Sequence, residues 1–284
     1  MPLPTPAYVR GACVTSRSHR GIKGYGLHIC CLTVDASVER ISRPAAAFFD
    51  LDKTVISKSS TLAFSRPFYQ YGLITRGAAL RCMTGHLAYR MGGASHGQME
   101  LVREWVGAQC CGWPVDRVRE IVARHLDELI VPYIYAEARA LICAHQAAGR
   151  DVIIVSTSGH EVVDPIARLL GADAVIATRM AVARGCYTGQ LEFYAYGEAK
   201  ATRIRDLAAE RGYRLQDCHA YSDSATDLPL LQAVGHPHAV NPDRSLRRVA
   251  RQQGWPVLKF TAAANRPLRG GLPREPASIT NRSR

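Results

Sequence analysis

Two aspartates, Asp50 and Asp52, stand one residue apart directly after a short apolar run, and Thr54 follows them. On a loop that leaves a strand, residues at this spacing can aim both carboxylates at one point, where like charges repel each other. A bound divalent cation would keep one carboxylate ionised, while the other could cycle between protonated and ionised forms as a general acid and base. Taken alone, the pair is also compatible with a solvated turn, where Asp is common.

Further polar groups along the chain suit the same chemistry. A carboxylate that attacks a phosphoryl group brings one anion towards another, so cations and hydrogen-bond donors must surround the phosphoryl oxygens. Ser156 offers a hydroxyl and neighbouring main-chain N–H groups where a predicted strand ends. Lys200 stands alone in a stretch that otherwise uses Arg, although a lysine on an exposed helix start would look the same. Asp223 and Asp227 are one helical turn apart, and such hard oxygen ligands favour magnesium over a transition metal.

Short apolar runs that are followed at once by polar residues are typical of buried parallel strands. Four such runs lie at residues 45–49, 151–155, 218–221 and 238–240. The segments between them have helical periodicity and end at a glycine, as helices often do. These helices are predicted at residues 137–148, 198–211 and 245–253. The alternation predicts an α/β fold with a doubly wound parallel sheet, in which ligands bind beyond the carboxyl ends of the strands.

One long segment interrupts this alternation. Residues 61–129 contain no convincing strand, and apolar residues recur at helical spacing from Val118 to Leu129, behind a proline, Pro114, that is placed to begin a helix. We therefore predict a helical cap inserted after the first strand. The expected division is an N-terminal extension at 1–43, a catalytic core at 44–60 and 131–260, a cap at 61–130, and a basic, disordered tail at 261–284.

The net charge of +12 is confined to the two ends of the chain, because residues 44–240 carry 20 basic and 20 acidic residues. Because residues 44–240 have no net charge, the total charge of +12 does not favour a nucleic-acid partner. No apolar stretch approaches the roughly 18 residues that a membrane span needs. Nine cysteines without a C-x-x-C pair indicate reduced thiols, and we expect a cytoplasmic protein.

The order and spacing of these groups resemble the four motifs of the haloacid dehalogenase superfamily. The likeness runs from about residue 45 to 260, and four motifs in order are a strong signal. Within the superfamily, the chain is similar to subfamily IB, the phosphoserine-phosphatase-like (SerB-like) branch. Within that branch, it resembles actinomycete members that are described as inhibitors of morphological differentiation. The motifs are Asp50-x-Asp52-x-Thr54, Ser156, Lys200 and Asp223-x-x-x-Asp227, supported by the strings "TGQLE" and "YSDSATDLPLLQAVG".

The resemblance implies a phosphatase mechanism for the first group of residues. Asp50 would be the nucleophile and form an aspartyl-phosphate. Asp52 would protonate the leaving alkoxide and then deprotonate the water that hydrolyses the intermediate. Thr54 would brace the loop, and Lys200 would neutralise charge around Asp50. Asp223 would bind Mg²⁺ together with the Asp50 carboxylate and the Asp52 main-chain oxygen.

The resemblance also implies substrate contacts. Ser156 and Thr157 would bind the phosphoryl oxygens, and Asp227 would orient Lys200 or a water on the metal. In the cap, Arg103 is a candidate partner for a substrate carboxylate, although a solvated helix arginine is the alternative. The partner expected from this set is a small phosphorylated substrate, whereas the oligomeric state does not follow from the sequence.

Two positions depart from the pattern of phosphoserine phosphatases. Ser59 stands where those enzymes have a glutamate for the substrate's amino group, so phosphoserine is disfavoured as the substrate. Thr226 stands where the family usually has Asn, which puts one phosphate-side contact in doubt. Four aromatic residues of the first cap helix could face an apolar leaving group such as a lipid phosphate, or could form the core of the cap: Phe64, Phe68, Tyr69 and Tyr71.

Three functions from different classes fit the sequence. The first is a magnesium-dependent phosphomonoester hydrolase that acts on a small phosphorylated metabolite or a lipid-like phosphate. The second is a phosphotransferase on the same scaffold, which passes the phosphoryl group to an alcohol. The third is a regulatory protein of differentiation whose basic ends bind nucleic acid or a membrane surface.

Overall fold

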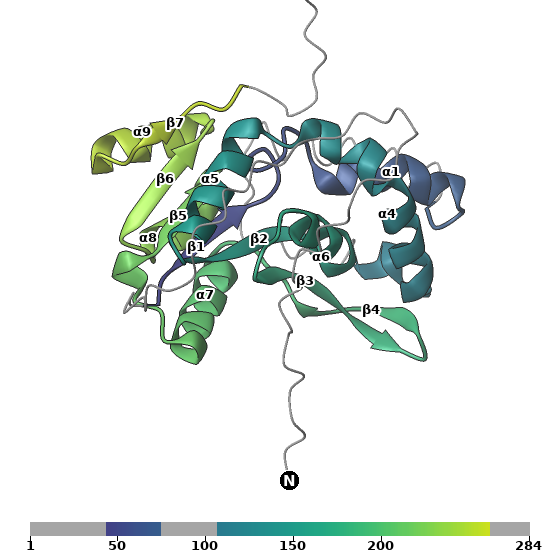
Figure 1. Cartoon of the computed structure of the whole chain (residues 1–284). Coiled ribbons are helices and arrows are strands. Elements are labelled where there is room, and N and C mark those ends of the chain that lie inside the picture. Colours follow the sequence, from purple (N-terminus) through teal and green to yellow (C-terminus); the bar gives the residue numbers. More distant parts are fainter. Residues whose placement is uncertain (1–43, 75–106, 262–284) are drawn as a thin grey trace, which may run out of the picture. The chain divides into compact units, whose positions relative to one another are not determined.

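The computed structural model describes residues 44–74 and 107–261 of the chain. Contacts divide the chain into residues 1–41 and residues 42–284, and all described residues belong to the second unit. This unit has a seven-stranded sheet in the order β4-β3-β2-β1-β5-β6-β7 (Figure 1). The strands are β1 (Ala46–Asp50), β2 (Asp151–Gly159), β3 (Ala174–Ala183), β4 (Cys186–Phe193), β5 (His219–Ser222), β6 (His236–Val240) and β7 (Val257–Leu258).

The sheet is parallel except for its β3–β4 pair, which is antiparallel. The predicted α/β fold with a doubly wound, mostly parallel sheet is therefore confirmed, and all four apolar runs lie in strands. β1 is buried along its whole length because it lies between β2 and β5 and is covered on both faces. A strand in this position is apolar throughout, as the run "AAFF" is.

Helices cover both faces of the sheet. Apolar side chains of α5 (Ala136–Ala147) and α6 (His160–Leu169) belong to the core on one face, together with Phe49 of β1. On the other face, the core that contains Phe48 includes side chains from α7 (Glu198–Arg211), α8 (Leu228–Gln232) and α9 (Arg244–Gln253). Successive residues of β1 thus face opposite helical layers, which is the consequence of strand pleating.

Left-handed glycines end two of the predicted helices. α7 ends at Gly212, with φ of 71°, and α9 ends at Gly254, with φ of 67°. A residue with a side chain is strained in this conformation, so glycine is favoured where the chain turns back towards the sheet. The glycines that predict the ends of these two helices therefore reflect a preference of the backbone for the left-handed conformation at those positions.

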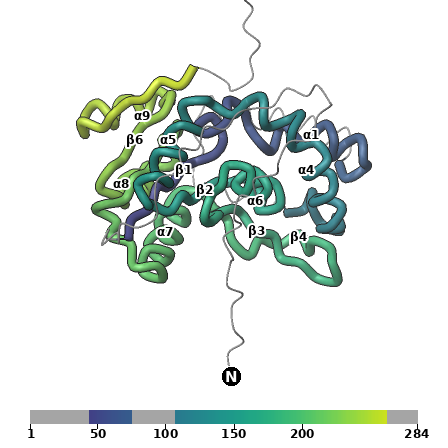
Figure 2. The backbone as a smooth tube through the Cα atoms, in the orientation of Figure 1, coloured from purple at the N-terminus to yellow at the C-terminus, as the bar shows by residue number. Residues whose placement is uncertain are grey.

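Helices α1 (Ser60–Gln70) and α4 (Val115–Leu129) belong to the described part of the segment expected to form a cap. They pack on each other, and α4 also packs on α6 (Figure 2). Pro114 is the N-cap residue of α4, in agreement with its predicted position at the start of a helix. Phe64 and Phe68 of α1 are buried in the core, so these two aromatic rings stabilise the packing of the helices.

The structure adds elements to those that the sequence predicts. Besides α8 and β7, they are α6 and the antiparallel pair β3–β4. α6 carries Pro165 within its second turn, and the β3–β4 hairpin has many half-buried and exposed residues in place of a continuous apolar run. Both features weaken the patterns on which the prediction depends.

Stacked rings occupy the sheet face under one edge of α5. His219 stacks on His236 and His238, with ring centroids 4.6 and 5.6 Å apart, and Tyr221 stacks on His238 at 4.6 Å. His145 of α5 contacts this stack, and its Nε2 and the hydroxyl of Tyr221 are 2.8 Å apart. Burial, with further contributions from Arg150 and His238, lowers the pKa of His145 to about 4.

Acid should therefore destabilise the fold through this stack. A histidine whose folded-state pKa lies below its unfolded value of about 6.5 contributes its full stability above pH 6.5, and loses it as the pH falls towards the folded value. Burial also lowers the pKa of His219 to about 3. We expect His145 alone to reduce the free energy of unfolding by on the order of 2 kcal/mol between pH 6.5 and 4.5.

Urea unfolding at a series of pH values measures this effect. The variant His145→Gln keeps a polar side chain but cannot take up a proton in this range, so its stability should fall less steeply below pH 6.5 than that of the parent protein. Carboxylates titrate equally in both proteins, and the difference between the two curves isolates the histidine. Parallel curves would show that His145 does not contribute.

Candidate active site

The candidate site lies at the carboxyl ends of β1, β2 and β5, where the strand order reverses. From β1 the chain proceeds to β2 and β3 on one side, and it returns to place β5 on the other side of β1. Loops that leave strands in opposite directions open a crevice at such a point. The register brings the site residues together, since Asp50 pairs with Val155, directly before Ser156, and Phe49 pairs with Tyr221, directly before Ser222.

Asp50 is the last residue of β1, and the residue is 6% exposed. After it, the chain coils tightly, with the N–H of Val55 donating to the carbonyl of Leu51 at 2.9 Å. Lys53 in this turn has a φ of 63°, an uncommon conformation for a residue with a side chain. The turn brings the buried hydroxyl of Thr54 back to Asp50, where it donates to Oδ2 at 3.2 Å.

Lys200 joins two carboxylates that come from different loops. Its ammonium group donates to Asp50 Oδ1 at 2.9 Å and to Asp227 Oδ2 at 3.0 Å, and the residue is only 2% exposed. It lies in the first turn of α7, and so the helix fixes the position of its stem. Burial alone would lower the pKa of Lys200, but Asp227 and Asp50 outweigh it and raise that pKa above the usual value. The lysine is therefore a permanent cation between two acids.

The loop after β5 carries the second acidic pair. Asp227 is buried at the end of a short 3₁₀ turn (Ala225–Asp227) and accepts a hydrogen bond from the hydroxyl of Ser222 at 2.8 Å. Asp223 is only partly buried, and its main-chain carbonyl accepts from the N–H of Asp243 at 2.8 Å. One carboxylate thus faces Lys200, while the other lies at the more open side of the loop.

Ser156 and Thr157 follow each other near the end of β2. Ser156 is 1% exposed, and its Oγ accepts a hydrogen bond from the N–H of Ser158 at 3.2 Å. The hydroxyl of Thr157 donates to the carbonyl of Ala195 at 2.9 Å, which ties β2 to the chain after β4. The register with β3 shifts between Ser156 and Gly159, an irregularity that redirects side chains at a strand end.

Asp52 is surrounded by hydrogen-bond donors from α1 and β2. Its Oδ1 accepts from the N–H of Ser60 at 2.9 Å, and its Oδ2 accepts from the hydroxyls of Ser59 and Ser158, both at 3.3 Å. Ser59 is also the N-cap residue of α1, where its side chain accepts from the N–H of Leu62. The residue that replaces the glutamate of phosphoserine phosphatases therefore caps the helix and contacts Asp52.

The electrostatics of the site are dominated by excess negative charge. Burial raises the pKa of Asp50 well above its ordinary value, and Lys200 offsets this effect only in part. Burial likewise raises the pKa of Asp223 to about 7, against an opposing contribution from Lys53. Five carboxylates act on one another here, those of Asp50, Asp52, Asp223, Asp227 and Asp243, with the ammonium groups of Lys53 and Lys200 to balance them. A cation would relieve this imbalance.

The donor set fits a magnesium ion. Carboxylate and carbonyl oxygens are the ligands that Mg²⁺ prefers, and it commonly uses only one or two protein carboxylates. Within residues 44–74 and 107–261, no three His, Cys, Asp or Glu side chains converge as a metal-binding group. A site made of the Asp50 and Asp223 carboxylates with the Asp52 main-chain oxygen would agree with that finding, because its third ligand is not a side chain.

The structure brings together most of the residues that the sequence singles out. Asp50, Thr54, Lys200 and Asp227 form one hydrogen-bonded group, while Ser156 lies near the end of β2 and Asp223 directly follows β5. Arg103 lies outside the described residues.

The structure also identifies side chains that the motifs do not. Thr226, at the position where the family usually has Asn, donates its hydroxyl to Ser224 at 3.1 Å. Ser158, which touches Asp52, is missed by motif spacing, although its place two residues after Ser156 on a strand would have been a signal.

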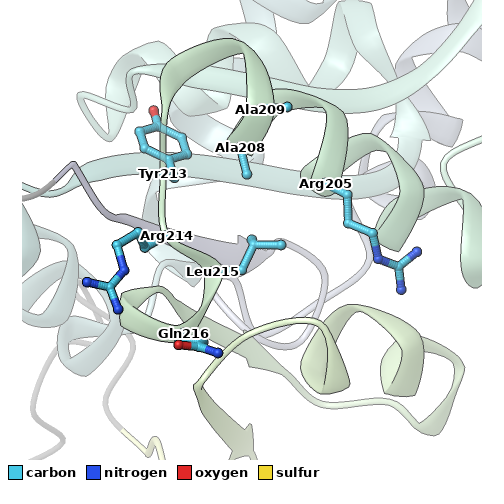
Figure 3. Close-up of a pocket in the computed structure, with 7 residues that line it drawn as sticks. All are labelled: Arg205, Ala208, Ala209, Tyr213, Arg214, Leu215 and Gln216. Atoms are coloured by element: carbon cyan, nitrogen blue, oxygen red, sulfur yellow. The ribbon is translucent and has the colours of Figure 1, made fainter.

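A separate hollow of about 410 Å³ lies between the second half of α7 and the chain that follows it (Figure 3). Its lining residues are Arg205, Ala208, Ala209, Tyr213, Arg214, Leu215 and Gln216. The two arginines already form ion pairs, Arg205 with Glu198 and Arg214 with Asp217. None of the site residues lines this hollow, so it is distinct from the candidate active site.

Comparison with known proteins places this fold and site in a family. Residues 47–232 match the family model described as haloacid dehalogenase-like hydrolase. The chain belongs to this family and is a hydrolase, as the motifs predict.

Two bacterial relatives are close in sequence. The inhibition of morphological differentiation protein of Streptomyces azureus is 60% identical over 234 residues, which are 82% of this chain and 83% of that protein. A probable phosphatase of Mycobacterium tuberculosis is 52% identical over 233 residues, or 82% and 80% of the two chains. A substrate-bound phosphoserine phosphatase shares the fold, with a TM-score of 0.53 at 21% identity over 76% of this chain and 92% of that one. The resemblance to this branch of the superfamily is confirmed.

Proposed function

We propose that this chain is a magnesium-dependent phosphomonoester hydrolase that works through an aspartyl-phosphate on Asp50. The observation that carries the proposal is the contact of a buried carboxylate, at the end of the central strand, with a buried lysine at 2.9 Å. Such a carboxylate is fixed in direction and partly neutralised, which a nucleophile needs when it approaches an anion. The family and the names of the relatives support a phosphatase.

Asp50 would attack the phosphorus atom with one carboxylate oxygen while the P–O bond to the leaving alcohol breaks. Lys200 and Thr54 hold the carboxylate by one oxygen each, at Oδ1 and Oδ2. These contacts restrict its rotation, so little orientational freedom remains to be lost in the transition state. The hydroxyl of Ser156 is placed on the next strand, where it could donate to a phosphoryl oxygen.

Asp52 would supply the proton for the leaving alkoxide and later remove one from the hydrolytic water. Its two oxygens are not equivalent. Oδ1 faces the N–H of Ser60, which can only donate, whereas Oδ2 faces the hydroxyls of Ser59 and Ser158, and the hydroxyl of Ser59 can rotate and accept. Oδ2 is therefore the oxygen that can carry the transferable proton.

Magnesium would be held by the carboxylates of Asp50 and Asp223 and the main-chain oxygen of Asp52. When bound, it supplies positive charge that offsets the repulsion between the substrate phosphate and the carboxylates of the site. The buried ion triad of Asp50, Lys200 and Asp227 has one negative charge in excess when both acids are ionised, and the ion would offset that charge.

The described part of the site favours a substrate whose leaving group has no amino group to recognise. Ser59 has no charge to offer an ammonium group, and its hydroxyl already contacts Asp52. Because Ser59 is uncharged, the site suits a leaving group without an ammonium group, so a small phosphorylated metabolite or a lipid-like phosphate is the proposed substrate class.

The test is hydrolysis of p-nitrophenyl phosphate by the full-length protein before and after removal of divalent ions. We expect chelation to reduce the rate by about 100-fold or more, and added Mg²⁺ to restore it, because the ion stabilises the charge of the transition state. Asp223→Asn should need at least about 10-fold more Mg²⁺ for half-maximal rate.

Two controls make the metal test specific. Mg²⁺ binding to the parent protein and to Asp223→Asn is measured directly by calorimetry, which separates weaker binding from lost chemistry. Asp217→Asn changes an acid outside the site, in an ion pair with Arg214 at 3.4 Å, and it should leave the Mg²⁺ requirement unchanged. A rate that does not respond to chelation would exclude the proposed role of the ion.

A phosphotransferase on the same scaffold is the second candidate. It differs only in the acceptor, because an alcohol replaces water in the attack on the aspartyl-phosphate. Adding alcohols to the assay and looking for a transphosphorylated product separates the two reactions.

We also propose a cytoplasmic location, which is supported by cysteines that form no disulfide in the described part of the chain, such as Cys143 and Cys218. No helix within residues 44–74 and 107–261 is long and apolar enough to cross a membrane.

A further inference from the structure

We infer that Ser158 is a positioning residue for the general acid, and that it fixes the direction of the Asp52 carboxylate through a hydroxyl network shared with Ser60 and Thr61. This inference rests on the proposed function and deepens it. None of the three hydroxyls belongs to the four motifs. They come from two segments about a hundred residues apart, the start of α1 and the end of β2.

Ser158 lies at the centre of the network. Its hydroxyl oxygen is 3.3 Å from Asp52 Oδ2, 2.8 Å from the Ser60 hydroxyl and 2.9 Å from the Thr61 hydroxyl. Ser158 is 7% exposed and Ser60 is fully buried, so water does not freely replace the bond between these two hydroxyls, whereas Thr61 is exposed. Three polar partners around a single hydroxyl are more than a serine needs for burial.

The number of protons fixes the direction of the bonds. A serine hydroxyl has one proton to donate and two lone pairs to accept with. Ser158 donates its proton to Asp52 Oδ2, and therefore the hydroxyls of Ser60 and Thr61 must be the donors to Ser158. Every hydrogen-bonding position of Ser158 is then filled, and hydrogen bonds aligned in this way polarise one another towards the carboxylate.

The network connects Asp52 to the first helix after the nucleophile strand. The N–H of Ser60 holds Oδ1, and the hydroxyl of Ser60 reaches Oδ2 through Ser158. The positions of both Asp52 carboxylate oxygens therefore depend on the first turn of α1, which Ser59 caps. Any movement of this turn relative to β2 would rotate the carboxylate that has to face the leaving group.

Orientation of this kind should affect one part of the reaction selectively. A leaving group that is a weak base departs with little help from an acid, while a strongly basic one needs a proton in the transition state. Loss of the Ser158 hydroxyl should therefore slow the esters of basic leaving groups and spare those of good ones. A merely structural serine would slow all substrates equally.

The experiment compares Ser158→Ala with the parent enzyme on a series of aryl phosphates of similar size, from p-nitrophenyl through phenyl to p-methoxyphenyl phosphate. The quantity is kcat/KM, which reports formation of the phosphoenzyme for each ester. We expect a loss of about 10- to 100-fold for p-methoxyphenyl phosphate and less than about 3-fold for p-nitrophenyl phosphate. Thermal unfolding of each variant is measured alongside.

Matched variants define the role of the hydroxyl. Ser158→Thr retains a hydroxyl and should recover most of the loss, while Ser60→Ala keeps the bond from Ser158 to Asp52 and should give a smaller effect of the same form. Ser65→Ala removes a hydroxyl of α1 that donates to the carbonyl of Leu62 and has no part in the network. It should behave as the parent. If Ser158→Ala does not fold, Ser158→Cys, a weak donor, replaces it.

Equal losses across the series, or no loss at all, would overturn the inference while leaving the proposed phosphatase intact. Failure of the proposed function has a different signature, because a variant that lacks the Asp50 carboxylate would then still hydrolyse every ester. The Ser158 variants test the inference and the variant that lacks the Asp50 carboxylate tests the proposed function, so the same assay distinguishes the two failures.

Discussion

Replacing Asp50 with Asn should reduce hydrolysis of aryl phosphates by about 10⁴-fold or more, since an amide cannot form the acyl phosphate on which the reaction depends. The side chain keeps its shape, so binding of the substrate phosphate is expected to survive. The free energy of unfolding should not fall, because burial already raises the pKa of Asp50 and a neutral group is easier to bury. Initial rates and thermal unfolding of the same preparation measure both effects.

The control is Asp217→Asn, which neutralises an exposed aspartate in an ion pair with Arg214 at 3.4 Å. Ion pairs of this kind contribute little, and we expect both the rate and the stability to stay close to those of the parent. A mass measurement of the Asp50→Asn protein excludes conversion of Asn back to Asp. Retained turnover in a verified Asp50→Asn protein would contradict the role of Asp50 as the nucleophile.

The sequence predicts the centre of the fold well because the physics there is simple. The middle parts of β1 and β2 are buried on both faces, so their residues must be apolar, and a run such as "VIIV" can be recognised by itself. The ends of α7 and α9 are equally visible, since each needs a glycine in a left-handed conformation. These signals are local, and they do not depend on tertiary contacts.

The outer elements carry no comparable local signal. β4 is an edge strand whose burial alternates, with Gly189 in the middle of its sequence, and only the pairing with β3 identifies it. α6 contains Pro165, which usually ends a helix. Tertiary packing stabilises both elements, α6 through its contacts with α4 and β3. Patterns along the sequence cannot represent these contacts.

The site shows the same division between chemistry and support. Asp50, Lys200 and Asp227 are identified by residue type and spacing because the reaction requires them. Ser158 is identified only by the structure, because its function depends on the register shift at the end of β2 and on the position of α1. A serine near a strand end is common, and three hydroxyls that meet a carboxylate are not visible until the chain has folded.

Removing the ammonium group of Lys200 should give the second large effect, on stability and activity together. In Lys200→Met an unbranched side chain fills the same space, but Asp50 and Asp227 lose their shared partner at 2.9 Å. Loss of one partner from a buried ion pair typically costs roughly 3–5 kcal/mol, which we expect here as well. Turnover should fall by about 10²- to 10³-fold, because no cation then offsets the negative charge beside Asp50.

The double variant Lys200→Met/Asp227→Asn separates the two effects. It removes the carboxylate left without a partner, and the free energy of unfolding should recover much of the loss, as when both members of a buried pair are replaced. Turnover should stay low, because the cation next to the nucleophile is still absent. Lys259→Met, at an exposed lysine, is the control for the substitution itself. If turnover returned together with stability in the double variant, Lys200 would serve only to keep the loops folded, and the charge beside Asp50 would have no part in the chemistry.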